Sequence, residues 1–171
     1  MKKTYLIMKY IMSIFLIFLI SLNLVLGLEE IEAVNFELNN LISLLSESNA
    51  CELIKDEMES ELVGFTLPKQ IPFTNEVFVI FIDSNFIGNV KLENKEVTSF
   101  DCSSEIKSNF EVHLSSSIFT EEQMELLKES PVDYYLNNKK DGNIKIKANG
   151  FVRGIKLGFI NFGVKIASFF I

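Results

Sequence analysis

The chain has 171 residues, enough for one domain with its own hydrophobic core, and sixteen of them are Phe while none is Trp. Its formal net charge is −7, and 23 acidic but only 13 basic residues follow position 27. This charge argues against nucleic acid as a partner, since DNA and RNA bind clusters of Lys and Arg. Arg153 is the single arginine, so bidentate recognition of phosphate is poorly provided for.

Residues 1–27 have the pattern of an export signal. Three lysines lie among the first nine residues, an apolar run fills 10–26, and Gly27 offers a small residue at a cleavage point. A retained membrane anchor is the alternative, because the apolar run is just long enough to span a bilayer. Both interpretations place the chain from Leu28 onward outside the cytoplasm, at its surface or beyond.

Two cysteines remain in the exported part, Cys51 and Cys102. An oxidising compartment favours a disulfide between them, while two separate buried thiols are the alternative. The chain has one His and no Cys-x-x-Cys pair, so we expect no metal site and no cofactor.

Two acidic helices are expected over 28–64. Apolar residues recur at helical spacing over 29–47, and a second helix is expected after Asn49, a candidate cap, with its stop at Gly64. Two prolines make 64–73 an extended connector.

The remaining chain alternates between strand and helix patterns. The strand at 76–83 is apolar on both faces and is expected at the centre of a sheet whose first strands form an antiparallel meander. A capping box at Thr120 and a Ser130-Pro131 start predict two short helices. The other strands are expected at 86–92, 96–101, 110–115 and 144–147.

The chain ends in an apolar helix that begins after the turn at Gly150. A helix this apolar is expected to be covered on most of its circumference. It can pack on the sheet, close a cavity, or lie on a lipid surface.

No catalytic constellation is recognisable. His113 has no partnered nucleophile, and the serines at 115–117 lack a nucleophile elbow. Asp83, Asp101 and Asp141 fall at turns, where aspartate has local structural reasons to occur. We therefore expect a protein that is not an enzyme.

The order of elements from position 76 onward resembles the SCP2 (sterol carrier protein 2) family of lipid-transfer domains. That family's G-x-I-x-I-x-G strand before the last helix is matched by Gly142, Ile144, Ile146 and, shifted by two residues, Gly150. The resemblance covers 76–170 and places an SCP2-like domain at 65–171. It implies an α+β fold: a curved, five-stranded, largely antiparallel sheet with helices on one face.

The same resemblance implies an apolar tunnel between sheet and helices for an acyl, sterol or isoprenoid chain. Arg153 and Lys156 would meet a lipid headgroup; solvated charges are the alternative. For each apolar residue the alternative is ordinary close-packed core. The candidate lining residues are Phe78, Ile80, Ile82, Met124, Leu127, Phe151, Ile155, Phe159 and Phe162.

Two functions follow from these observations. The first is an exported, non-catalytic SCP2-like module that binds a lipid or isoprenoid ligand and sits near a membrane surface. The alternative is a structural or protein-interaction module at the outer face of the membrane, with a closed core and acidic helices that contact a protein partner.

Overall fold

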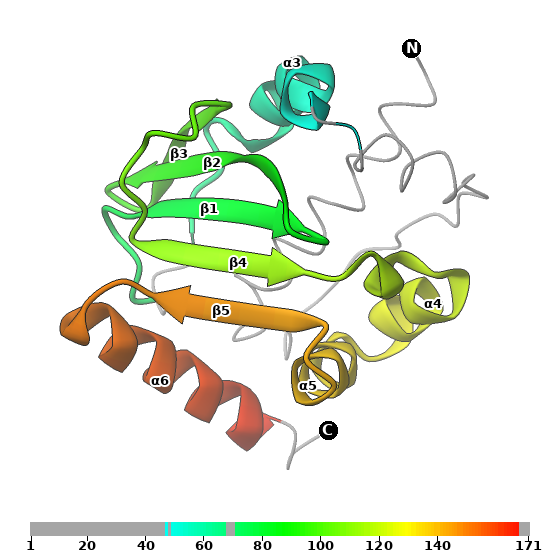
Figure 1. Cartoon of the computed structure of the whole chain (residues 1–171). Helices are drawn as coiled ribbons and strands as arrows, with labels where there is room; N and C mark the ends of the chain where they lie inside the picture. Colours follow the sequence, from blue (N-terminus) through cyan, green and yellow to red (C-terminus); the bar gives the residue numbers. More distant parts are fainter. Residues whose placement is uncertain (1–46, 48, 68–70, 168–171) are drawn as a thin grey trace.

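The computed structural model describes residues 47, 49–67 and 71–167, and shows an α+β fold with a five-stranded sheet (Figure 1). The export segment at 1–27 and nearly all of the helix expected over 29–47 lie outside the described residues. The elements are α3 (Ala50–Leu62), β1 (Val77–Ile82), β2 (Asn85–Glu93), β3 (Glu96–Asp101), β4 (Phe110–Leu114), the 3-10 turn η1 (Ser116–Phe119), α4 (Glu121–Glu129), α5 (Pro131–Lys140), β5 (Ile144–Ala148) and α6 (Phe151–Ala167).

The strands are ordered β3-β2-β1-β4-β5, which puts β1 at the centre as its two apolar faces predict. Three of the neighbouring pairs are antiparallel, and β1 with β4 is parallel, so the sheet is mixed. The crossover 102–109 leads into the parallel pair. There the Asn109 side chain accepts the backbone N–H of Val77 at 2.7 Å, while the Asn109 N–H donates to the Val77 carbonyl at 2.8 Å.

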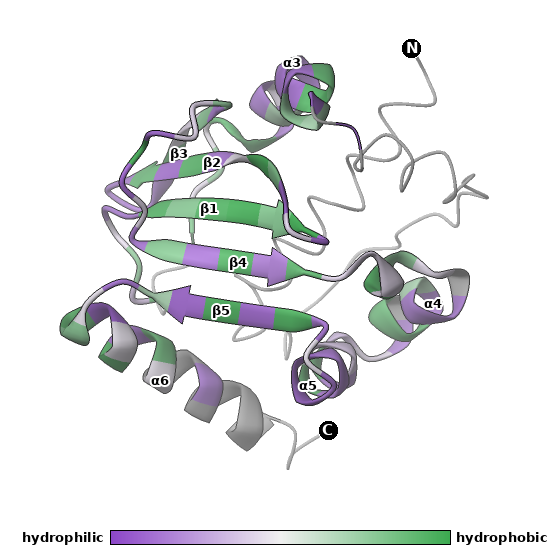
Figure 2. Ribbon diagram, viewed as in Figure 1, coloured by the Kyte–Doolittle hydropathy of each residue, from purple (hydrophilic) through white to green (hydrophobic). Residues whose placement is uncertain are grey.

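The two faces of the sheet differ sharply in polarity. On the inner face Phe78 lies between Val90 and Phe110, and all three are buried. On the outer face Glu111 is paired with Lys147 in the neighbouring strand. Figure 2 shows this alternation along β5, while β1 is hydrophobic almost throughout. The period of two therefore directs one row of side chains into the core and the other to solvent.

The helices α3, α4 and α5 cover the inner face. Buried residues from each join one core cluster with the inner rows of the strands. α6 lies along the edge strand β5 instead (Figure 1). The five buried positions of α3 are Ala50, Cys51, Ile54, Met58 and Leu62.

Helix starts follow the predicted positions, but two of the three caps lack the expected side-chain bond. The Thr120 hydroxyl accepts the Gln123 N–H at 3.4 Å, as the capping box predicts. Ser130 occupies the N-cap of α5, but its hydroxyl donates to the Asp133 carboxylate at 2.7 Å and makes no cap bond. The side chain of Asn49 also makes no cap bond to α3.

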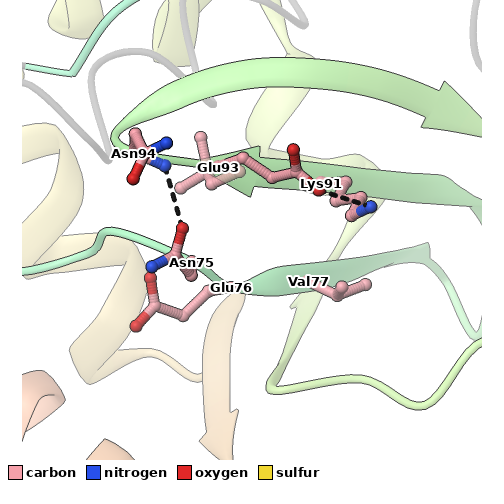
Figure 3. Close-up of a pocket in the computed structure, with 7 residues that line it drawn as sticks. Asn75, Glu76, Val77, Lys91, Glu93 and Asn94 are labelled. Atoms are coloured by element: carbon pink, nitrogen blue, oxygen red, sulfur yellow. Dashed lines mark hydrogen bonds and ion pairs between the residues drawn. The ribbon is translucent and has the colours of Figure 1, made fainter.

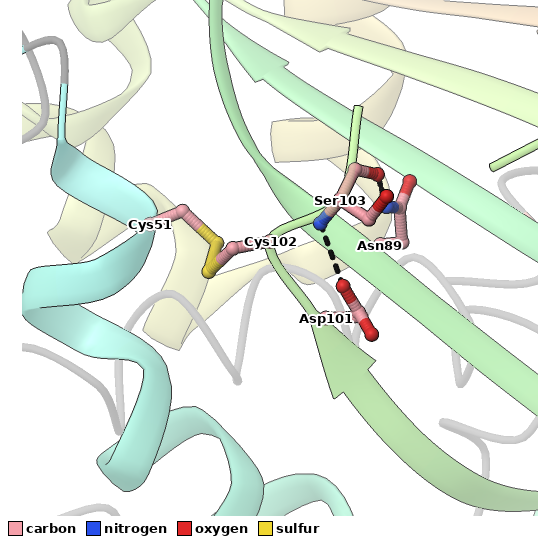
Figure 4. The surroundings of a disulfide bond; sticks show 5 residues. All are labelled: Cys51, Asn89, Asp101, Cys102 and Ser103. Carbon is pink, nitrogen blue, oxygen red and sulfur yellow. Dashed lines mark hydrogen bonds between the residues drawn. A yellow bond between two sulfur atoms is a disulfide. The ribbon is translucent and has the colours of Figure 1, made fainter. Parts of the chain in front are cut away.

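Cys51 and Cys102 form a disulfide, with their Cα atoms 5.6 Å apart (Figure 4). The bridge joins the first turn of α3 to the residue after β3. Because it spans 51 residues of sequence, it closes a long loop and ties α3 to the sheet.

Gly88 is required by close packing inside the sheet. A Cβ at this position would lie 2.3 Å from the Cζ atom of Phe100. The Phe100 ring, itself buried, fills the space that a side chain would occupy.

Candidate functional site

An open cleft of ≈ 450 Å³ lies between the start of α6 and the segment before β1. Gly150 has a φ of +114°, a value that favours glycine, and its carbonyl accepts the Gly154 N–H at 3.0 Å as α6 begins. This turn brings the first residues of α6 beside a stretch some eighty positions earlier in the chain. The lining residues are Thr74, Asn75, Glu76, Gly150, Phe151, Val152, Arg153 and Lys156.

A largely buried ion pair holds α6 at this cleft. Lys156 Nζ lies 2.5 Å from Glu76 Oε1, and the two side chains are 26% and 5% exposed. The other carboxylate oxygen of Glu76 accepts the Thr74 N–H at 2.5 Å. A carboxylate so far removed from water depends on these two donors for its stability.

A second, smaller cleft of ≈ 340 Å³ shares Asn75 and Glu76 with the first (Figure 3). Its rim is closed by the Asn94 N–H, which donates to Asn75 Oδ1 at 2.9 Å. Lys91 and Glu93 form an ion pair of 2.7 Å along β2, half exposed to solvent. Val77 and Leu92 line this cleft beside its polar residues.

The two predicted headgroup residues lie together in the larger cleft. Arg153 Nη1 donates to the Asn149 carbonyl at 2.6 Å, and Lys156 is engaged by Glu76. A ligand anion would therefore compete with these partners for both cations. Whether either meets a headgroup stays a prediction.

A second polar contact anchors α6 further along. Asn161 Oδ1 accepts the Tyr135 hydroxyl at 3.1 Å and also accepts from Lys139 Nζ of α5. Burial raises the pKa of Tyr135 to about 12, so the phenol is a donor at every physiological pH. Leu157 packs against the core between the two anchors.

The structure divides the predicted pocket residues into two groups. Phe78 lies in the core, in contact with the rings of Phe73 and Phe110 at centroid distances of 5.1 Å each. Ile80, Ile82, Met124 and Leu127 belong to the same buried cluster.

The α6 members do not join that cluster. In the first turns of α6, Phe151 is 84% exposed, Val152 67% and Ile155 46%, which contradicts, for this part of the helix, the expectation that it is covered on most of its circumference. The side chains of Phe159 and Phe162 lie outside the described residues. The lining role of all these residues stays a prediction.

No local sequence pattern indicated that Glu76 would be a buried, ion-paired residue of the cleft. Glu76 precedes an all-apolar strand, and nothing in its neighbourhood reveals that it faces inward toward Lys156. The partners of Asn161 on α5, Tyr135 and Lys139, are likewise not indicated by any local pattern.

The outer face holds the single histidine. His113 stacks on Phe81 with 4.7 Å between ring centroids, and its Nε2 lies 3.2 Å from Glu111 Oε2. The hydrogen bond with His113 lowers the pKa of Glu111 most, helped by Asn149 and Lys147 and opposed by desolvation. No nucleophile is described beside these two residues, so we interpret them as a hydrogen-bonded pair on the outer face.

Among residues 47, 49–67 and 71–167, no group of three His, Cys, Asp or Glu side chains is placed to hold a metal ion. Within the same ranges, no helix combines the length and apolarity needed to cross a membrane.

No protein-family model matches the chain, and no curated protein matches its sequence. Among solved structures, a similar one is the sterol carrier protein 2 from Yarrowia lipolytica in its apo form. It is 15% identical, the match covers 72% of this chain and 92% of that chain, and the TM-score is 0.27. A superposition this loose carries no argument, so SCP2 membership stays a prediction and the α+β fold with its mixed sheet rests on the coordinates alone.

Proposed function

We propose that the chain is an exported, non-catalytic module that binds an apolar ligand of the lipid or isoprenoid class, between α6 and the edge of the sheet. The observation that supports this most is the incomplete burial of α6. Its sequence is that of a covered helix, yet the apolar side chains of its first turns are exposed beside an open cleft. Apolar surface left uncovered next to a cleft is typical of a ligand site.

The ligand tail would lie in the seam between β5 and α6. Burial along the inner face of β5 decreases from Ile144, which is buried, to Ile146 and Ala148, which are partly exposed. On α6, Leu157 is partly buried and packs against the core. A tail in this seam would complete the burial of these side chains.

In this proposal the larger cleft, which Arg153 and Lys156 line, would be the entrance to the seam. A carboxylate or phosphate headgroup would replace the Asn149 carbonyl as the partner of Arg153, and Lys156 would keep its buried partner Glu76. Exchange of one exposed oxygen partner for another costs little, so the affinity would come mainly from buried apolar area.

The test is native mass spectrometry of the purified protein, with solvent extraction, followed by titration with fluorescent fatty-acid and isoprenoid probes. We expect a bound apolar molecule or saturable probe binding. Ala148→Phe fills the seam and should abolish binding, whereas Val63→Phe adds the same ring at an exposed site on α3's end and should leave binding unchanged. A protein that carries no ligand and ignores both probe classes contradicts the proposal.

A second candidate is a protein-interaction module that acts through α3. The disulfide ties this helix to the sheet, and its outward side exposes Leu53 beside Glu52 and Asp56. A basic partner would suit that surface. Pull-down with Glu52→Lys/Asp56→Lys tests it, because α3 keeps its buried face; undiminished partner recovery counts against this function.

A further inference from the structure

The first turns of α6 present an uncovered apolar side. At 100° per residue Phe151, Val152 and Ile155 fall within an arc of about 100°. These three are half of the six large hydrophobic residues that are exposed in the described part of the chain. Gly154 and Gly158 flank the same side, and a Cβ at either would meet no described atom within 4 Å. This side of α6 is therefore largely uncovered by the described part of the chain.

Basic residues surround this apolar side. Residues 139–171 hold seven of the chain's sixteen Lys and Arg residues and one of its 23 acidic residues. Lys145 and Lys147 are exposed on the outer face of β5, which leads directly into α6. Lys147 is 3.6 Å from Glu111 but remains 63% exposed on its side chain. The carboxyl-terminal part is thus positively charged, while the rest of the chain is strongly negative.

We propose that the start of α6, with Lys145 and Lys147 of β5, docks on an anionic lipid bilayer. Exposed apolar side chains on one side of a helix with flanking lysines are the features by which peripheral helices enter a headgroup region. The acidic remainder of the chain would be repelled by the same surface, so charge alone orients the molecule with α6 toward the lipid. A second copy fits less well, because two basic faces would then oppose each other.

This inference and the proposed ligand site both start from the exposed first turns of α6, but neither requires the other. An empty protein with a closed core would still dock, and a ligand-binding protein could act away from membranes. The two proposals therefore fail separately.

The chain contains no Trp, so one introduced indole reports its own surroundings without background. The full-length variants Phe151→Trp and Leu53→Trp are compared in vesicles of phosphatidylcholine, with and without phosphatidylglycerol. Both positions are exposed, so neither substitution disturbs the core. Residues 1–27 can themselves hold the chain on a vesicle, so vesicle binding as such does not test the proposal. The measured quantities are therefore the emission wavelength of the introduced indole and its quenching by brominated lipids.

We expect blue-shifted, quenched emission from position 151 in anionic vesicles only, and water-like emission from position 53 in both. Adding Lys145→Glu/Lys147→Glu to Phe151→Trp should weaken the lipid contact on the order of tenfold. As a control, Lys91→Glu at an exposed site on β2, added to Phe151→Trp, should leave the lipid contact unchanged. Water-like emission at position 151 in anionic vesicles overturns the proposal. So does a blue shift already present without lipid, since another part of the protein or a protein partner then covers the patch.

Discussion

The ion pair between Glu76 and Lys156 gives the sharpest test of how α6 is held. Lys156→Met leaves a buried carboxylate with the Thr74 N–H as its remaining described donor. Breaking a buried pair from one side costs roughly 3–5 kcal/mol. Since Lys156 is 26% exposed, water screens part of the charge, and we expect a loss of about 2–3 kcal/mol, or a fall in Tm of roughly 10 °C.

The matched control is Lys91→Met, which breaks an exposed pair and should cost less than about 0.5 kcal/mol. The decisive variant is the double one, Glu76→Gln/Lys156→Met. Removing the unpaired charge should restore stability above that of Lys156→Met alone. Thermal and urea unfolding measure all four proteins. If Lys156→Met matches Lys91→Met, or if the double variant is the least stable, the ion pair does not hold α6 as described.

Three further outcomes follow from the coordinates. Loss of the disulfide through Cys51→Ser/Cys102→Ser should lower the free energy of unfolding by roughly 4 kcal/mol, because it frees a loop that spans 51 residues, and urea unfolding measures this. Gly88→Ala should cost about 1–3 kcal/mol in the same assay, because its Cβ meets the Phe100 ring. Glu111 has a lowered pKa in the folded state, so it stabilises the fold above the usual glutamate pKa of 4.5 and loses this effect as the pH falls through its folded pKa. The stability difference between wild type and Glu111→Gln should therefore shrink on acidification below that value.

Each of these outcomes has a control. Gly158→Ala, in open space on α6, should stabilise by up to about 1 kcal/mol where Gly88→Ala destabilises. A reduced protein that unfolds at the same urea concentration as the oxidised one would show that the bridge adds nothing. For Glu111, a carboxyl resonance that titrates at its ordinary value in NMR would contradict the bond from His113.

Strand positions were predictable because alternation and turn residues are local signals. β3 lies where it was expected, and the apolar faces of 76–83 correctly predicted the central strand. The parallel pairing of β1 with β4 was not predicted, because alternation tells which way a side chain points and not which strand is its neighbour. The path of the crossover 102–109 determines that β4 lies beside β1, and the polar sequence of this segment does not indicate that path.

The site was predictable in part. Arg153 and Lys156 were recognised as cations at the start of the last helix, and the cleft brings them together. The burial of Glu76 depends on a residue eighty positions later, which no local pattern reveals. Phe151 and Ile155 were expected to be covered, but both are exposed. An apolar sequence indicates that a helix surface favours burial, but it does not show which part of the chain would bury it.

The central claim is that an apolar ligand binds under α6, and amide hydrogen exchange with and without a saturating fatty acid tests it most directly. We expect slower exchange confined to 144–161 and 74–76, the two walls of the seam and its mouth. Unchanged exchange there, or protection that appears only around α3, would contradict the claim.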